Sequence, residues 1–332
     1  MKKIRVGLIG CGFMGKMHAD CYRAIGNAEL AAVADLRPDC AEKAAAGSAA
    51  IYRDGKDLLD NEKLDAVDIC LPTYLHTKYA LMAMEKAKYV FIEKPVALTA
   101  AECEALMKKS RETGCQVQVG QVIRFWDEYV KLREFIESGI YGPVSHASFK
   151  RISPRPMWGW EGWLLDFDRS GGAGQDLFIH DLDYALSVFG KPLECHSVRS
   201  RRGEKNSFTD MQLRYKDFCV NLESTWDLPG AYHFSAGFRV VFEKATVELA
   251  GGKFTLYDGN GAGDIVMEKE ELGTSDSGGN ISDLGGYYKE LNYFVKRAAS
   301  GEPVEEARLS DAVDSLLFLL DDMAKDPDLN AD

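Results

Sequence analysis

The sequence predicts two domains: an α/β domain with a doubly wound parallel sheet, then an α+β domain with a large, mainly antiparallel open sheet. Three observations lead to this prediction. Apolar runs alternate with segments of helical periodicity through the first 120 residues. After Gly120 this alternation stops, and β-rich runs follow one another between residues 208 and 257. The 332 residues also exceed what one small core needs, which suits two domains.

The first domain, residues 1–121, alternates strand and helix signals. Continuous apolar runs predict strands buried on both faces, and apolar residues at helical spacing predict the helices between them. The strands are expected at Ile4–Gly10, Ala28–Asp35, Ala66–Leu71, Tyr89–Ile92 and Gln116–Val119, and the helices at Phe13–Ile25, Pro38–Ala46, Thr77–Lys86 and Thr99–Thr113. Thr99 followed by Glu102 has the pattern of a capping box. This alternation implies right-handed crossovers and a parallel sheet covered by helices on both faces.

The second domain, residues 122–332, carries helix signals at both ends and strand signals between them. A glycine-rich loop at Gly171 leads into a helix that runs to Phe189, and Lys216-Asp217 joins two β-rich runs in a hairpin. The strands are expected at Phe208–Tyr215, Phe218–Trp226, Phe238–Leu249 and Lys253–Tyr257, and the other helices at Glu128–Ser138, Tyr287–Ala299 and Ser310–Met323. Residues 258–286 are rich in Gly and Ser, which predicts loops.

Composition excludes several classes of protein. The net charge of -12 argues against nucleic-acid binding, which needs clustered Lys and Arg. No apolar run reaches the roughly 18 residues of a membrane helix, and the run at Ile4–Gly10 fits a buried strand better than a signal peptide. No two of the eight cysteines are spaced as C-x-x-C, so we expect reduced thiols, a cytoplasmic protein and no metal site.

A glycine motif, Gly10-x-Gly12-x-x-Gly15, follows the first predicted strand and opens the first predicted helix. In this context Gly10 permits a tight turn, Gly12 lets a pyrophosphate approach the backbone, and Gly15 lets helix and strand pack closely. The N–H groups of the helix start, at Phe13 and Met14, would face the phosphates. The alternative is a glycine turn without a ligand. We favour the dinucleotide site because strand, turn and helix occur in the required order.

Asp35 ends the second strand, twenty residues beyond Gly15. A carboxylate there can accept hydrogen bonds from the adenine-ribose hydroxyls and would repel a 2′-phosphate, which favours NAD over NADP. Arg37, two residues further, leaves NADP open because a guanidinium can accommodate that phosphate.

The segment Glu93-Lys94-Pro95 follows the fourth predicted strand of the sheet, at the edge where ligands bind in open α/β sheets. Pro95 fixes its own φ and keeps Lys94 out of the helical region, so the lysine side chain leaves in a defined direction. Its ammonium could polarise a substrate oxygen or relay a proton. The alternative is an ordinary surface lysine at a strand end.

The second candidate cluster lies where the glycine-rich loop meets the following helix. If that helix begins near Gln175, Asp176 and His180 stand four residues apart on one face. A histidine beside a reacting hydroxyl can take its proton while a nicotinamide takes the hydride, and a nearby carboxylate can orient the substrate. Alternatively, Asp176 is a helix cap and His180 a buried core residue. Zinc ligation has no third ligand at suitable spacing.

Together these features resemble the Gfo/Idh/MocA oxidoreductase family, named for glucose-fructose oxidoreductase and inositol dehydrogenase, over nearly the whole chain. Glu93-Lys94-Pro95 and the loop leading to Asp176 and His180 make the resemblance specific, and the spacing of Asp176, Ile179, His180, Asp181 and Asp183 is similar to the inositol (myo-inositol 2-) dehydrogenase branch. The resemblance implies an NAD-binding Rossmann domain, followed by a domain for substrate binding and oligomerisation. It implies an NAD(P)-dependent oxidoreductase acting on CH–OH groups of a small sugar or polyol.

The resemblance also implies roles for individual residues. Lys94, Asp176 and His180 match the family's catalytic trio, with His180 as general acid/base, and Arg124 matches a basic position on the substrate side. The positions that match the family's cofactor-lining residues are Pro72, Thr73, His76, Glu93 and Lys94. Two positions depart from the common pattern and put the actual sugar in doubt: Ala173 stands where many members have a third glycine, and Leu164 where many have an arginine.

Two other functions remain open at this stage. A relative with the same fold could hydrolyse a glycosidic bond by transient oxidation of its substrate with tightly held NAD. A non-catalytic NAD-binding sensor is the second, although it would need neither Lys94 nor His180. We also expect a homo-oligomer, a tetramer or dimer, because both alternating side-chain sets of the antiparallel sheet include apolar residues, such as Val220 and Cys219.

Overall fold

The computed structural model describes residues 3–200, 208–267, 274–275 and 283–326. Its contacts divide the chain into two compact units: residues 1–125 with 270–314, and residues 126–269 with 315–332. The chain therefore returns to the first unit after it has built most of the second. The first boundary lies four residues beyond the predicted division at 121/122, and the assignment of cofactor binding to one domain and substrate binding and oligomerisation to the other stays a prediction.

The first unit contains a six-stranded parallel sheet in the order β3-β2-β1-β4-β5-β6, as the sequence predicts for a doubly wound domain. β4 and β5 are buried at every residue, which is expected of strands covered on both faces. The order reverses between β1 and β4, which is where such sheets bind ligands. The strands are β1 Ile4–Ile9, β2 Ala28–Ala34, β3 Ala50–Tyr52, β4 Ala66–Ile69, β5 Tyr89–Ile92 and β6 Gln116–Val119.

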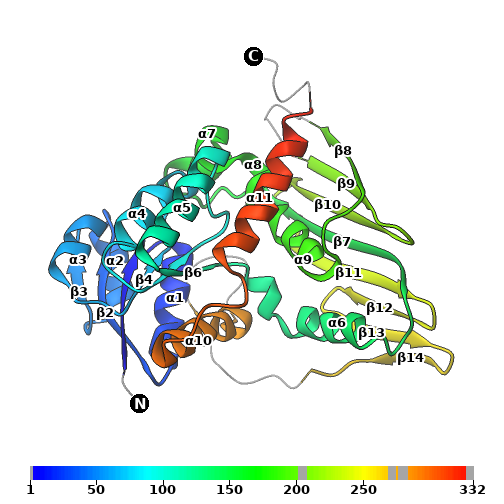
Figure 1. The fold of residues 1–332 in the computed structure, drawn as a ribbon, viewed down its shortest axis with the longest axis horizontal. Helices are drawn as coiled ribbons and strands as arrows, with labels where there is room; N and C mark the ends of the chain where they lie inside the picture. The colour runs from blue at the N-terminus through cyan, green and yellow to red at the C-terminus, as the bar shows by residue number, and fades with distance from the viewer. Residues whose placement is uncertain (1–2, 201–207, 268–273, 276–282, 327–332) are drawn as a thin grey trace. The chain divides into compact units, whose positions relative to one another are not determined.

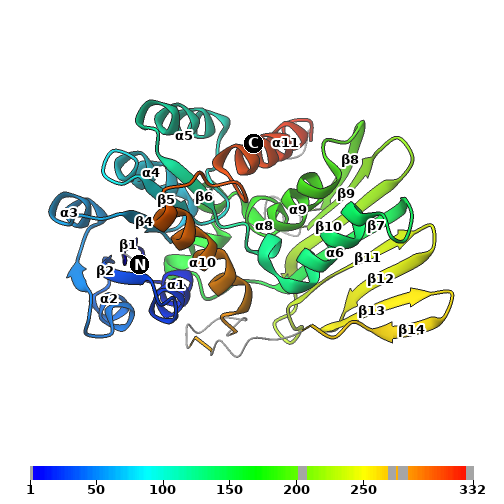
Figure 2. The same ribbon diagram turned by 60° about the horizontal axis from the view of Figure 1, so that its bottom comes forward.

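Helices cover both faces of this sheet (Figures 1 and 2). α1 and α10 lie together on one face, and α3, α4 and α5 follow one another on the other. The capping box of Thr99 and Glu102 is confirmed at the start of α5. The helices of this unit are α1 Phe13–Ala24, α2 Pro38–Ala45, α3 Gly55–Asn61, α4 His76–Ala83, α5 Ala100–Thr113 and α10 Gly285–Ser300, with 3-10 turns at Thr73–Leu75 and Val122–Phe125.

The second unit contains an eight-stranded open sheet in the order β14-β13-β12-β11-β7-β10-β9-β8. Every pairing is antiparallel except β7 with β10, so the prediction of a mainly antiparallel sheet is confirmed. The predicted hairpin is also confirmed, as β9 pairs with β10. The strands are β7 Val144–Pro154, β8 Glu194–Ser200, β9 Phe208–Arg214, β10 Cys219–Leu228, β11 Ser235–Phe242, β12 Ala245–Ala250, β13 Lys253–Asp258 and β14 Gly261–Asp264.

Helices α6 (Asp127–Ser138) and α9 (Ile179–Phe189) pack on one face of this sheet (Figure 2). Tyr129 and Tyr184 from these helices contact each other edge to face, and they meet Phe149 of β7 and Phe238 of β11 in an aromatic core. Aromatic pairs of this geometry add to the free energy gained from burial alone. The remaining helices are α7 Phe167–Ser170, α8 Gly172–Asp176 and α11 Leu309–Met323, with a 3-10 segment at Trp160–Leu165.

Several predicted elements were wrong in detail. The run 238–249 is two strands, because the chain reverses at Glu243-Lys244, whose N–H groups bond to Pro143 and Tyr141. The predicted loop 258–286 contains the short strand β14 and the first residues of α10. The helix expected to begin near Gln175 is interrupted: α8 ends at Asp176 and α9 begins at Ile179.

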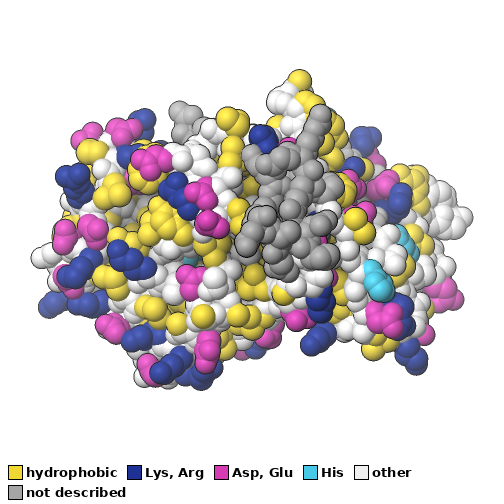
Figure 3. Space-filling view, turned by 90° about the horizontal axis from the view of Figure 1, so that it is seen from above, with side chains coloured by type: hydrophobic (Ala, Val, Ile, Leu, Met, Phe, Trp, Pro, Cys, Tyr) yellow, Lys and Arg dark blue, Asp and Glu magenta, His cyan; other side chains and the backbone are white. Residues whose placement is uncertain are grey.

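Acidic and basic side chains are interspersed over the face of the molecule shown in Figure 3, as expected when 52 acidic and 40 basic residues are spread along the chain. Among the described residues, no helix has the length and apolar composition to cross a membrane.

Candidate active site

The glycine turn between β1 and α1 has the geometry that its sequence predicts. Gly10 has φ +94°, and a Cβ there would stand 2.5 Å from the carbonyl oxygen of Cys70. A Cβ on Gly15 would collide with the carbonyl oxygen of Gly10. Both positions therefore require glycine, the first for its backbone angle and the second for the close approach of helix and strand.

Gly12 has a different role, because it crowds no backbone atom. It precedes Phe13 as the N-cap of α1, and a Cβ there would meet only the Arg37 guanidinium, at 3.3 Å. Because Gly12 has no side chain, a pyrophosphate could reach the first N–H groups of α1. The hydroxyl of Thr73 is buried at the adjoining end of β4 and has no hydrogen-bond partner among the described residues. These features fit a dinucleotide.

Asp35 follows β2, and its carboxylate accepts hydrogen bonds from four N–H donors. They are the backbone N–H of Cys11 (2.7 Å) and of Arg37 (2.8 Å), and the Nε (3.1 Å) and Nη2 (3.3 Å) of the Arg37 guanidinium. The first of these bonds ties Asp35 to the glycine turn. The predicted ribose-binding carboxylate and the predicted phosphate-binding guanidinium are therefore ion-paired with each other.

Pro72, Thr73 and His76 lie at the carboxyl end of β4, where the chain passes through a 3-10 turn into α4. His76 is buried, and its ring nitrogens lie 2.7 Å from the carbonyl oxygen of Leu71 and 2.8 Å from that of Pro95. Burial lowers the pKa of His76 more than these carbonyls raise it. His76 thus braces the segment that follows β5, and its contact with a cofactor stays a prediction.

Glu93 and Lys94 follow β5 at the same edge of the sheet as the glycine turn, and the Lys94–Pro95 peptide bond is cis. The Glu93 side chain is buried, whereas Lys94 is partly exposed. Glu93 Oε2 accepts a hydrogen bond from the Lys94 backbone N–H at 3.0 Å. The structure therefore gives Lys94 a fixed backbone at the edge where the resemblance predicts chemistry.

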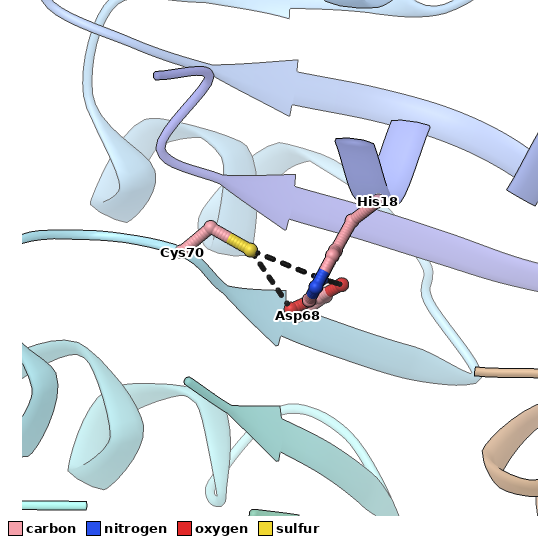
Figure 4. Close-up of side chains that lie close together, drawn as sticks. All are labelled: His18, Asp68 and Cys70. Carbon is pink, nitrogen blue, oxygen red and sulfur yellow. Dashed lines mark hydrogen bonds and ion pairs between the residues drawn. The ribbon is translucent and has the colours of Figure 1, made fainter. Parts of the chain in front are cut away.

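Behind Glu93 lies a buried polar cluster that the sequence analysis missed. His18 of α1 bridges two carboxylates: its Nδ1 is 2.8 Å from Asp68 Oδ2, and its Nε2 is 3.0 Å from Glu93 Oε1. Figure 4 shows His18 pointing between Asp68 of β4 and Cys70, which directly follows β4. The Cys70 Sγ lies 3.1 Å from His18 Nδ1 and 3.4 Å from Asp68 Oδ1. An aspartate inside the apolar run Ala66–Ile69 was the signal that could have revealed the cluster.

Three of these side chains, His18, Asp68 and Cys70, are of metal-ligand type, with their ligand atoms within 4.8 Å of one another. Two ligands of a tetrahedral zinc ion would stand about 3.3 Å apart. The 2.8 Å between Nδ1 and Oδ2 is instead the length of a hydrogen bond. The geometry therefore describes a hydrogen-bonded ion pair.

Arg124 was predicted on the substrate side, and the structure places its guanidinium in the interior of the first unit. The side chain is 5% exposed and pairs with Glu306 (3.1 Å) and Asp311 (3.6 Å). Both carboxylates come from the returning segment 270–314, which no local sequence pattern could connect with Arg124. A contact with substrate stays a prediction.

Asp176 and His180 lie in the second unit, Asp176 at the end of α8 and His180 in the first turn of α9. Both side chains are partly exposed. Leu177 and Phe178 separate the two helices but keep helical backbone angles, and whether Asp176 and His180 act as a pair stays a prediction. Their catalytic roles stay a prediction.

Both positions that depart from the family pattern, Ala173 and Leu164, are buried near the loop before α8. Gly171 and Gly172 have positive φ, whereas Ala173 lies inside α8 and does not. The Ala173 methyl group packs with Leu164 and Trp226 in a buried apolar cluster. Ala173 and Leu164 therefore pack in the core beside the loop. Neither residue has a positive φ, so neither position needs a glycine for its backbone angle.

Comparisons with known proteins agree with this architecture. Residues 4–121 match the family model described as an oxidoreductase family with an NAD-binding Rossmann fold, and residues 129–248 match that of the Gfo/Idh/MocA C-terminal domain. A myo-inositol 2-dehydrogenase of Thermotoga maritima is 26% identical over 316 residues, 90% of each chain. A D-glucoside 3-dehydrogenase of Escherichia coli is 31% identical over 192 residues, which are 57% of this chain and 55% of that protein.

Solved structures show the same fold. An oxidoreductase from Agrobacterium radiobacter, determined in complex with NAD+, L-tartaric acid and magnesium, matches 98% of this chain and 97% of its own. The TM-score is 0.83 at 18% sequence identity. The likeness therefore extends over both units.

Proposed function

The chain belongs to the Gfo/Idh/MocA oxidoreductase family, and from this premise we propose that it is an NAD-dependent dehydrogenase for a secondary alcohol of a cyclic polyol, sugar or sugar derivative. The observation that carries the proposal is the shared sheet edge. The glycine turn, Asp35 and Glu93-Lys94 all follow the carboxyl ends of parallel strands in one sheet. The names of the relatives, which act on inositol and glucosides, support the substrate class.

In this proposal the chain's own residues bind the cofactor and move the proton. The glycine turn and the start of α1 hold the pyrophosphate, and Asp35 accepts from the adenine-ribose hydroxyls. His180 takes the proton of the substrate hydroxyl as general base, Asp176 orients the substrate, and the Lys94 ammonium stabilises the oxygen that becomes a carbonyl. Bound NAD supplies the acceptor for the hydride.

Two further features belong to the proposal. We place the protein in the cytoplasm, because all eight cysteines are free thiols, as expected in a reducing compartment. We also propose that it is a homo-oligomer, in line with the exposed apolar side chains of the second unit, such as Val198 and Tyr257.

Replacing His180 tests the proposed mechanism. We expect His180→Ala to lower single-turnover hydride transfer by ~10²–10⁴-fold, the usual effect of losing a general base. NAD affinity should stay within about twofold, because the predicted cofactor contacts lie in the first unit. Lys94→Ala should behave alike, and the double variant should lose less than the product of the single losses, since both groups serve one transition state.

The matched control is His196→Ala, because His196 is an exposed histidine on β8 and is not one of the candidate site residues. It should retain wild-type turnover. A folded His180→Ala variant with wild-type turnover on a substrate of the native enzyme would refute the role of His180. Melting temperatures on the same preparations show whether a loss of turnover is only a loss of fold.

A further inference from the structure

We propose that His18 is a positioning residue of the active site, which holds the Glu93 carboxylate and, through it, the backbone of Lys94. The inference rests on the proposed function only for the catalytic role of Lys94. The structural chain of contacts stands by itself, within the first unit.

The Glu93 carboxylate is clamped between its partners. One oxygen, Oε1, faces His18 Nε2 at 3.0 Å, and the other, Oε2, accepts the Lys94 backbone N–H at 3.0 Å. Gly120, which follows β6, packs closely against the Glu93 carboxylate, because a Cβ at Gly120 would stand 3.0 Å from Glu93 Oε2. A carboxylate with this little room transmits a shift of the imidazole directly to the Lys94 peptide.

The His18 ring is fixed in turn from its other side. Asp68 Oδ2 lies 2.8 Å from Nδ1 and also accepts the Tyr22 hydroxyl at 2.8 Å. Phe91 of β5 meets the imidazole edge to face, with ring centroids 5.4 Å apart. The hydrogen bond of Nδ1 with Asp68, the ion pair of Nε2 with Glu93 and the contact with Phe91 together favour one orientation of the ring.

The contacts also favour a charged ring. Nδ1 and Nε2 each lie at ion-pair distance from a carboxylate oxygen, which favours the imidazolium form of His18. The contact of Nε2 with Glu93 is an ion pair rather than a hydrogen bond, because Nε2 has no hydrogen-bond partner among the described residues. Burial by itself lowers the pKa of His18, and the neighbouring Cys70 and Asp68 outweigh that effect, so this pKa lies well above its ordinary value. Among the described residues, the titratable groups around the ring include Cys21, Tyr22, Asp68, Cys70, Glu93, Tyr287 and Glu290.

Charged side chains in this interior are unfavourable for stability because of their desolvation free energy. Burying an ion pair removes both ions from water, and apolar side chains of similar volume often give equal or greater stability. His18 and Asp68 are fully buried, yet their contacts lead through Glu93 to a partly exposed lysine at the ligand-binding edge. We infer that the cluster is present because it positions Lys94. A displacement of a catalytic group by about 1 Å can lower the reaction rate by ~10²-fold.

The test compares His18→Gln with Tyr22→Phe. Both remove a polar group of α1 from the same cluster, but only His18 touches Glu93. In the protein without substrate, we expect His18→Gln to speed hydrogen exchange of the Lys94 amide by at least ~10-fold relative to its strand neighbours, because its acceptor is released. Tyr22→Phe should leave that exchange rate unchanged. Turnover should fall by ~10–100-fold in His18→Gln, with NAD affinity within twofold.

Unchanged Lys94 exchange in a folded His18→Gln variant would overturn the proposal. If that variant does not fold, nitrogen NMR of the wild type decides: both His18 nitrogens should stay protonated at pH 8, and a neutral tautomer there would also overturn it. Neither measurement uses a substrate, so a wild-type protein that reduces no NAD would refute the proposed function and leave this test intact.

Discussion

Asp35 and Arg37 form an ion pair, so the preference for NAD or NADP depends on whether the Asp35 carboxylate or the Arg37 guanidinium has the larger effect on the 2′ position of the ribose. We expect NAD to bind at least ~10-fold more tightly. A unit charge about 4 Å from Asp35 would feel a repulsion of up to ~4 kcal/mol near a protein surface, and 1.4 kcal/mol is already tenfold. Asp35→Ser should reduce the ratio of the NAD affinity to the NADP affinity. It should weaken the binding of NAD and remove the repulsion between Asp35 and the 2′-phosphate of NADP.

Calorimetric titration of both cofactors measures this preference. Asp39→Ser is the control, because Asp39 is exposed at the start of α2 and should leave the ratio of affinities unchanged. Equal or tighter binding of NADP by the wild type would mean that Arg37 determines the preference.

Residues whose role follows from their immediate neighbours could be predicted from the sequence. Gly10 and Gly15 are required by the strand, turn and helix around them, and the structure shows the crowding that excludes a side chain. His18, Asp68 and Glu290 could not be connected in this way. They come from three elements far apart in the sequence, and only the packed sheet brings them near one another.

At the scale of elements, α10 brings Glu290 into the interior of the first unit. Glu290 is fully buried, and neither carboxylate oxygen has a hydrogen-bond partner among the described residues. Burial, and then the negative charge of Glu93, raise the pKa of Glu290 well above its ordinary value. The folded protein therefore keeps this proton at a pH where the unfolded chain has lost it.

This raised pKa predicts a pH-dependent effect of Glu290→Gln on stability. Above the ordinary glutamate pKa of about 4.3, ionisation favours the unfolded wild type by up to ~1.4 kcal/mol per pH unit until the folded pKa is reached. Glutamine does not ionise. The free energy of unfolding of Glu290→Gln, relative to wild type, should therefore rise between pH 5 and pH 8 in urea titrations.

The control for this experiment is Glu104→Gln, because Glu104 is exposed on α5. Its difference from wild type should stay constant over the same pH range. A constant difference for Glu290→Gln as well would show that the Glu290 carboxylate is already ionised in the folded protein.

Elements with a strong apolar period were predicted closely, as the capped helix α5 and the buried strands β4 and β5 show. Short or polar elements were missed. β3 has three residues, none of them buried, and β14 consists of exposed residues in a glycine-rich segment. β8 and β7 carry too many polar residues to show an apolar run, and long-range pairing with β9, β10 and β11 makes them strands.

At the scale of the whole molecule, the return of residues 270–314 to the first unit could not be predicted, because nothing in that segment's own pattern identifies its partner. The structure also revises the basis of the predicted oligomer. In β10, Val220 and Leu222 are buried, but the alternate set continues from Cys219 into Asn221 and Glu223, which are polar.

The prediction of a homo-oligomer therefore depends on exposed apolar side chains, including Leu193, Val198 and Tyr257 of the second unit. We expect light scattering at micromolar concentration to give the mass of a dimer or tetramer, not that of a 36.8 kDa monomer. Val198→Lys should weaken the assembly if Val198 lies in the interface, whereas Ile51→Lys, at an exposed residue of β3 in the other unit, should not. A monomeric mass for the wild type would contradict the prediction.

The most direct measurement of the proposed function is the balance between oxidised substrate and NADH. Inositols, aldoses and their phosphates and glycosides would each be incubated with enzyme and excess NAD, and both NADH and products would be counted. We predict at least one substrate that yields one ketone and one NADH per turnover in the wild type, and Lys94→Ala and His180→Ala should form both products ~10²–10⁴-fold more slowly. Cleavage of a glycoside without net NADH, or NAD binding with no turnover of any compound, would contradict the assignment as a dehydrogenase.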